Sequence, residues 1–290
     1  MARTSWTEQP RVVAIRRRAP VLNAAVRAIN RYTRHRTGRN AALVSHYGFL
    51  SVFPLLLVFT TVLGFLLDDN PTLQEQIIDS VLSHIPIIGP ELAKDPESLT
   101  GSVPVLVFGL LTALWASLKA FNVLQTALDD IYDLPFDERP NVIVVRGRSL
   151  LGILIVGGGQ IAAAVLAGIL GVSGVEWYHR LWLFTGSVLM NTAVLAGTYH
   201  FLCSLRPRWR RIAPGAIVGG LLFSALQVVG TTLVTRAITR ASPIYGTFAT
   251  VIGLITWLGL HSMILLLGAE LNAVLPLRPY DEPDAAPRPT

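Results

Sequence analysis

The sequence predicts an all-α integral membrane protein, a bundle of six transmembrane helices with an outer amphipathic helix. Of its 290 residues 52% are hydrophobic and only 14% are charged, and the mean hydropathy is +0.52. A soluble domain carries about 25% charged residues, so this composition indicates a multi-pass membrane protein. Six apolar segments are long enough to cross a bilayer, for which about 20 residues suffice. The single cysteine, Cys203, excludes an internal disulfide and a cysteine metal cluster.

The first 40 residues form a basic arm with ten arginines and one acid, Glu8. Pro20 is expected to open an amphipathic helix, which suits the surface of an anionic leaflet. A nucleic-acid partner is not expected, because the basic run lacks interleaved aromatic residues and directly precedes a membrane span. The apolar face of this helix would hold Val21, Leu22, Ala25, Val26 and Ile29, and Arg27, Arg31 and Arg34 would contact anionic lipid head groups.

The chain divides into a basic cytoplasmic arm (1–40), a six-helix transmembrane domain (41–275) and a disordered cytoplasmic tail (276–290). Residues 68–102, with seven acids, are expected to hold an amphipathic helix on the outer face. The second span should continue as a helix beyond residue 121 and end before Pro135, and Pro214 should open the fifth. The six predicted spans are 42–67, 103–121, 150–172, 181–205, 214–234 and 247–275.

The basic residues are distributed unevenly between the predicted loops. With the amino terminus inside the cell, the cytoplasmic segments hold 19 basic residues and the outer segments hold 4. Cytoplasmic loops of membrane proteins carry an excess of Lys and Arg. The sequence therefore predicts a multi-pass membrane protein with both termini in the cytoplasm.

Polar residues recur at two depths in the predicted spans, counted at about 1.5 Å per residue. Either they line a substrate path, or they hydrogen-bond across helices and hold the bundle together. Glu270 is expected to pair with a basic residue, Lys119 first and His200 or Arg208 next, unless it points at lipid head groups. The midplane group is Gln160, Asn191, Gln227 and His261, and the group towards the cytoplasm is His46, Lys119, His200 and Glu270.

Several motifs resemble the YihY/BrkB family of bacterial inner-membrane proteins across residues 38–276. In chain order they read NAALVSHYGFLSVFPLLL, LWASLKAFNVLQTALDDIYDLPFDERP, RPRWRRIAPGA, SPIYGTF and LLLGAELNAV. The resemblance implies a six-helix inner-membrane protein linked to envelope integrity, and more loosely to transport or lipid handling. Family members formerly carried a ribonuclease BN label. This chain has no HxHxDH metal motif, and its six histidines are scattered singly.

The sequence favours a transporter-like role in the envelope, moving or positioning a lipid or another amphiphile. The alternative is a non-transporting scaffold that recruits envelope proteins through its outer amphipathic helix. An intramembrane enzyme is disfavoured, because no HExxH motif and no catalytic set stand out, and neither a cofactor nor a metal is expected. A continuous polar cavity joining the two polar layers would favour transport, and a solid, leucine-packed centre would favour the scaffold.

Overall fold

A computed structural model describes residues 20–66, 103–171, 177–227 and 247–275, and within these ranges the chain is helical, without strands. The all-α class is thereby confirmed. The predicted outer helix at 68–102 and the tail at 276–290 lie outside the described residues. The helices are α2 (Pro20–Arg34), α3 (Thr37–Leu66), α6 (Val103–Ile131), α7 (Val142–Gly171), α8 (Trp177–Leu202), α9 (Trp209–Ala225) and α11 (Thr247–Val274), with the short η3 (Phe136–Glu138) between α6 and α7.

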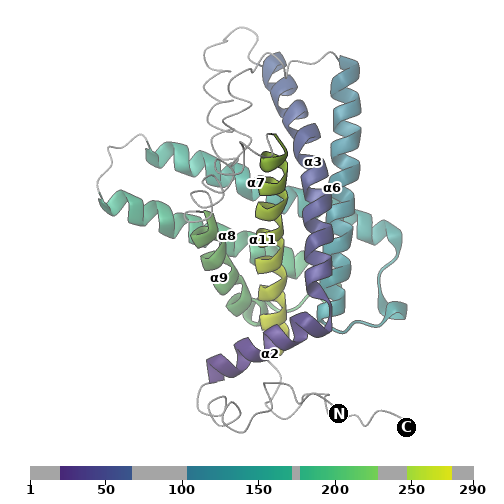
Figure 1. The fold of residues 1–290 in the computed structure, drawn as a ribbon, viewed down its shortest axis with the longest axis vertical. Coiled ribbons are helices and arrows are strands. Elements are labelled where there is room, and N and C mark those ends of the chain that lie inside the picture. Colours follow the sequence, from purple (N-terminus) through teal and green to yellow (C-terminus); the bar gives the residue numbers. More distant parts are fainter. Residues whose placement is uncertain (1–19, 67–102, 172–176, 228–246, 276–290) are drawn as a thin grey trace.

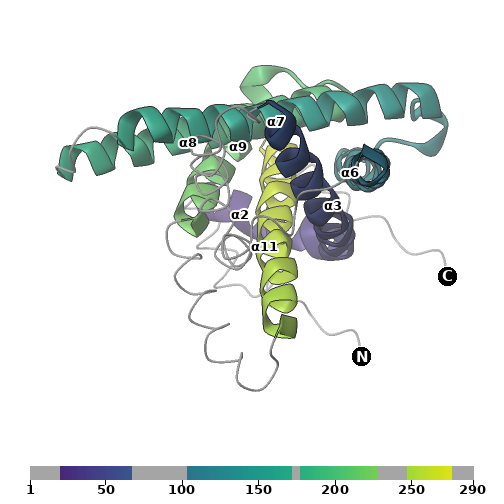
Figure 2. The ribbon, with the colours of Figure 1, turned by 90° about the horizontal axis from the view of Figure 1, so that it is seen from above.

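The helices are not all aligned. α3 and α6 run side by side along the long axis, α11 is inclined to them, and α7 and α8 run across them (Figure 1, Figure 2). This differs from a bundle in which all six helices lie alongside one another. The crossing is close, because a Cβ at Gly152 of α7 would lie 2.5 Å from the Phe121 ring of α6. Small residues allow helices to approach at such crossings.

Three described helices are long and apolar enough to cross a membrane. The candidate segments are Val107–Ile131 of α6, Val142–Gly159 of α7 and Val251–Val274 of α11. This finding supports a membrane protein. The three segments overlap three of the six spans that the sequence predicts.

The helix α2 begins at Pro20 as predicted, but the face predicted to be apolar is wrong in part. Ile29 is 48% exposed, whereas Arg27 and Arg31 are only 4% and 6% exposed. Arg31 turns towards the protein because carboxylates lie there, as described below. Between α2 and α3 the chain turns at Arg36, whose φ of 52° is unusual for a residue other than glycine.

The loop between α6 and α7 is closed by local hydrogen bonds. α6 runs on to Ile131 and ends before Pro135, as predicted. Asp133 adopts the left-handed conformation, with φ 53°, and the Leu134 N–H donates to the Asp129 carbonyl at 2.9 Å. At the start of α7, the side-chain oxygen of Asn141 accepts a hydrogen bond from the backbone of the first turn, which caps the helix.

The expectation that Pro214 opens a helix is wrong, because α9 begins five residues earlier at Trp209. The first turn of α9 is rich in arginine, so an apolar pattern cannot detect it. Beside the proline, the Gly215 N–H donates to the side-chain oxygen of Asn272 in α11 at 2.7 Å. A Cβ at Gly215 would collide with the Gly268 carbonyl oxygen. Glycines therefore allow α9 and α11 to touch at the backbone.

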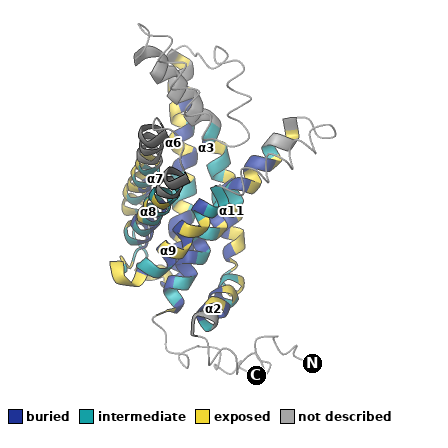
Figure 3. Cartoon of the chain, turned by 90° about the vertical axis from the view of Figure 1, so that its left-hand side faces the viewer, coloured by how far each residue is buried: buried dark blue, intermediate teal, exposed yellow. Residues whose placement is uncertain are grey.

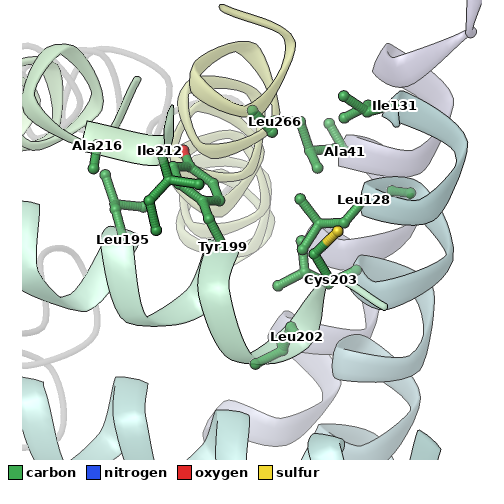
Figure 4. Packing of buried hydrophobic residues seen from close by; sticks show 13 residues of the cluster. Ala41, Leu128, Ile131, Leu195, Tyr199, Leu202, Cys203, Ile212, Ala216 and Leu266 are labelled. Carbon is green, nitrogen blue, oxygen red and sulfur yellow. The ribbon is translucent and has the colours of Figure 1, made fainter. Parts of the chain in front are cut away.

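The apolar core lies where α3, α6, α8, α9 and α11 meet (Figure 4). Leu128 of α6, Tyr199 of α8 and Leu266 of α11 are fully buried in it. The Tyr199 hydroxyl donates to the Leu265 carbonyl at 2.6 Å, so this buried polar group is satisfied. Figure 3 shows the buried positions around α9 and α11, with α2 at the end of the molecule.

Candidate functional site

The candidate site centres on Glu270 of α11, whose side chain is fully buried. The Thr37 hydroxyl donates a hydrogen bond to Glu270 Oε1 at 2.9 Å, and His35 Nδ1 lies 3.1 Å from the same oxygen. Arg31 Nε lies 3.4 Å from Glu270 Oε2, which is an ion contact without hydrogen-bond geometry. A carboxylate buried so completely needs such partners to remain charged.

Arg31 and His35 also contact a second carboxylate, that of Asp133 beyond the end of α6. Arg31 Nη2 donates to Asp133 Oδ2 at 2.8 Å and to the Ile131 carbonyl at 2.7 Å. His35 Nε2 lies 3.3 Å from Asp133 Oδ1. We call Arg31, His35, Thr37, Asp133 and Glu270 the buried charge cluster, although Asp133 itself is exposed.

Two turns place the members of the cluster. The left-handed turn at Arg36 separates α2 from α3, and it brings His35 and Thr37, on either side of it, to the same Glu270 oxygen. The left-handed Asp133 turns the end of α6 towards Arg31. Aspartate is among the residues that tolerate this conformation best. Three segments far apart in sequence therefore meet in one small network.

The cluster places the two negatively charged carboxylates of Asp133 and Glu270 beside the positively charged guanidinium group of Arg31. The guanidinium of Arg31 is permanently charged, and each nitrogen of His35 faces a different carboxylate oxygen. A protonated His35 donates to both oxygens and balances the two carboxylates, whereas a neutral His35 donates to one. Burial, and also the charge of Glu270, raise the pKa of the nearby Tyr32 hydroxyl above its ordinary value. The network joins α2 to α11 through the contact between Arg31 and Glu270.

The structure does not place Glu270 with the partners that the sequence suggested. Lys119 is an exposed residue of α6. His200 of α8 stacks on the Trp209 ring with centroids 4.3 Å apart, and its Nδ1 lies 2.9 Å from the Pro207 carbonyl oxygen. Arg208 is also exposed. The expectation of a basic partner therefore agrees with the structure, but the partners are Arg31 and His35.

Two of the four predicted midplane residues meet between α8 and α9. The Asn191 amide donates to Ser224 at 2.9 Å and lies 3.4 Å from Gln227 Oε1, and Ser187 bridges to both neighbours. These groups satisfy one another, which is the helix-bonding role considered above. The Gln160 side chain lies outside the part of the structure that is described.

The remaining predicted histidines lie elsewhere. His261 packs between the rings of Phe223 and Trp257, each 4.7 Å away, and its Nδ1 lies 2.9 Å from the Trp257 carbonyl oxygen. His46 is exposed and lies edge-on to Tyr47. Neither belongs to the buried charge cluster.

Of the three arginines predicted to contact anionic lipid, only Arg34 is exposed. Arg27 and Arg31 are buried, and Arg31 is engaged by the cluster. In this conformation these two guanidinium groups face the protein instead of a bilayer surface. Lipid contact by them requires α2 to leave its place on α11.

Sequence reasoning missed His35, Thr37 and Asp133 as members of the site. A weak signal was available, because Arg31 and His35 are four residues apart and so lie on one helix face. No local pattern reports that Asp133 lies across from them, since the Arg31–Asp133 bond joins residues 102 positions apart. Within the described ranges, no group of three or more His, Cys, Asp or Glu residues is placed to hold a metal ion.

Comparison with known proteins identifies a family whose model matches most of the chain. The family model described as Virulence factor BrkB matches residues 28–290. Putative ribonuclease-like protein YfkH of Bacillus subtilis is 24% identical over 269 residues, which cover 85% of this chain and 92% of the relative. Inner membrane protein YhjD of Escherichia coli is 24% identical over 263 residues, 83% of this chain and 77% of that one.

A shorter match has higher identity. A UPF0761 membrane protein of Methylibium petroleiphilum is 37% identical over 100 residues, which cover 31% of this chain and 23% of the relative. No solved structure matches the chain.

Proposed function

The chain belongs to the virulence factor BrkB family of membrane proteins, and from this premise we propose that it moves or positions a lipid or another amphiphile in the bacterial cytoplasmic membrane. The observation that carries the proposal is the buried charge cluster. An ionisable residue buried inside a membrane bundle indicates a functional site by default. In this protein the carboxylate of Glu270 contacts Arg31 and His35 of the basic arm. The negatively charged head group of an anionic amphiphile would suit the same two side chains.

We propose a role without an enzymatic step. YfkH carries a ribonuclease-like name, which is a property of that relative. An amphiphile also needs no continuous polar channel, because its hydrocarbon part stays in an apolar environment. The polar groups between α8 and α9 bond to one another.

The scaffold alternative has an observation in its favour. The centre of the molecule around Leu128, Tyr199 and Leu266 is closely packed, which suits a structural bundle. A scaffold would retain its function when Glu270 loses its charge, provided that the fold persists. Removing that charge therefore separates the two functions.

Glu270→Gln is expected to abolish lipid translocation while leaving membrane insertion intact. Glutamine keeps the shape and one acceptor oxygen, but it removes the charge that Arg31 and His35 face. The measurement is the translocation of a fluorescent anionic phospholipid in vesicles that contain the purified full chain. Lys119→Gln is the matched control, because Lys119 is exposed on α6 and should leave the rate unchanged. Full activity of the Glu270→Gln protein would remove the cluster from the mechanism.

We also propose six spans with both termini in the cytoplasm, on the strength of the arginine distribution. Single cysteines introduced at positions 95 and 210 should differ in accessibility from outside the cell. A membrane-impermeant thiol reagent is expected to label Asp95→Cys and to leave Arg210→Cys unlabelled. The natural Cys203 is buried and should contribute no background. The opposite labelling pattern would reverse the topology.

A further inference from the structure

An apolar cavity of about 130 Å³ lies between α2, α9 and α11. Its walls include Ala25 and Ile29 of α2, Val218 and Leu222 of α9, and Ile264 and Leu271 of α11. Every residue lining it is alanine, valine, isoleucine, leucine or glycine. A water molecule in such a space would lack hydrogen-bond partners, and apolar cavities of about 150 Å³ stay dry and bind small hydrocarbons. The cavity is therefore suited to a hydrocarbon group.

The rim of the cavity is open to the surroundings of the protein. Ile29, Val218 and Leu222 are 48%, 43% and 40% exposed, although all three are large apolar residues. They lie beside α11, a helix that is long and apolar enough to cross a membrane. In a bilayer, the hydrocarbon available to such an opening is the acyl chain of a neighbouring lipid.

The face of α9 that lines the cavity carries a positive charge nearer the beginning of the helix. Arg211 is exposed and precedes Val218 by seven residues and Leu222 by eleven. At 3.6 residues per turn these intervals place the three residues on one face, with Arg211 about 10 Å from Val218 along the axis. A lipid lying along this face would have its phosphate at Arg211 and an acyl chain in the cavity. The charge favours an anionic lipid.

We propose that this cavity is the acyl-chain subsite for an anionic membrane lipid, with Arg211 as the contact for the lipid phosphate. The proposal rests on the function proposed above, since it identifies the amphiphile as an anionic lipid and places one of its chains. It also gives α2 a second role. One side of α2 supplies Arg31 to the buried charge cluster, while Ala25 and Ile29 form a wall of the cavity. A movement of α2 away from α11 would open both.

The test uses the purified full chain in vesicles of phosphatidylethanolamine and phosphatidylglycerol that contain a phosphatidylglycerol with a photoactivatable acyl chain. After illumination, mass spectrometry locates the cross-linked residues. We expect cross-links to concentrate at 25–29 and 218–222, well above those at Leu154, an exposed apolar residue of α7. Ala25→Phe, which fills the cavity, should reduce this yield several-fold and slow translocation. Ala42→Phe, an exposed position of α3, is the matched control.

Two further variants complete the design. Arg211→Gln should lower the yield with the phosphatidylglycerol probe more than the yield with a phosphatidylethanolamine probe, because both lipids carry a phosphate but only phosphatidylglycerol has a net negative charge. Val218→Phe replaces Ala25→Phe if the latter fails to fold, as judged by its melting temperature. Uniform labelling of Leu154 and the cavity, or loss of cross-links in Ala25→Phe with full translocation, would overturn the subsite. Both results leave the function proposed above standing; that function instead fails if vesicles containing the unmodified full chain translocate no lipid.

Discussion

Replacing Arg31 by leucine is expected to destabilise the protein by about 3–5 kcal/mol, the range found when one partner of a buried ion pair is removed. Arg31 is 6% exposed and contacts Glu270, Asp133 and the Ile131 carbonyl. Without it, fully buried Glu270 retains Thr37 and His35, of which only a protonated His35 carries charge. Thermal unfolding of the purified protein measures the loss, and hydrogen exchange should show it first in α2.

The controls for this prediction separate charge from volume. Arg39→Leu removes an exposed arginine of α3 and should change stability by no more than about 0.5 kcal/mol. The double variant Arg31→Leu/Glu270→Leu removes both charges, and it should be more stable than Arg31→Leu alone, because a buried pair can be replaced by apolar residues at little loss. An Arg31→Leu protein as stable as Arg39→Leu would show that the cluster does not hold α2 in place.

The sequence predicted that Glu270 needs a basic partner, but it could not identify the partner. The need follows from local chemistry, because a carboxylate near the end of a long apolar helix must be paired or solvated. Choosing among partners by depth alone favoured Lys119, since depth ignores the direction in which a side chain points. The actual choice depends on the turn at Arg36, which folds α2 back over the end of α11. Such a turn leaves no periodic trace in the sequence.

The face of α2 was misjudged for a related reason. Hydrophobic periodicity assumes that apolar residues turn inward and charged residues turn outward. The buried carboxylate of Glu270 and the carboxylate of Asp133 face α2, and the proposed surroundings are lipid, so the assumption is reversed in part. Arg31 is buried, and Ile29 forms the rim of an apolar cavity. By contrast, the all-α class and the ends of α6 and α11 follow directly from composition and from proline positions, and these predictions agree with the structure.

The crosswise packing of α7 and α8 also lies beyond the sequence. Length and apolar composition indicate that a segment is a helix suited to a membrane, but they carry no information about its angle to its neighbours. That angle depends on pairs of residues in contact, such as Gly152 against Phe121 and the Gln125 amide, which donates to Ser149 at 2.8 Å. The sequence contains both residues of each pair, but only the tertiary structure shows that they are in contact.

A carboxylate outside the buried charge cluster, that of Asp129 in α6, should be nearly as important for stability as the cluster itself. It is 4% exposed, and it accepts hydrogen bonds from the Ser204 N–H at 2.9 Å and the Ser204 hydroxyl at 2.8 Å. The same hydroxyl accepts a bond from Arg148 of α7 at 2.8 Å. One carboxylate thus joins α6 to the end of α8 and, through Ser204, to α7.

Asp129→Ala is therefore expected to lower stability by about 3 kcal/mol, because hydrogen bonds to a charged group contribute about 1.5–3 kcal/mol and a backbone N–H is left without its acceptor. The neighbouring Asp130 gives a matched control. Its carboxylate is one third exposed and pairs with Arg139 at 2.7 Å, and pairs of this kind contribute at most about 1 kcal/mol. Asp130→Ala should therefore melt close to the unmodified protein, well above Asp129→Ala. Equal melting temperatures for the two variants would mean that the hydrogen bonds of Asp129 do not stabilise the junction of the three helices.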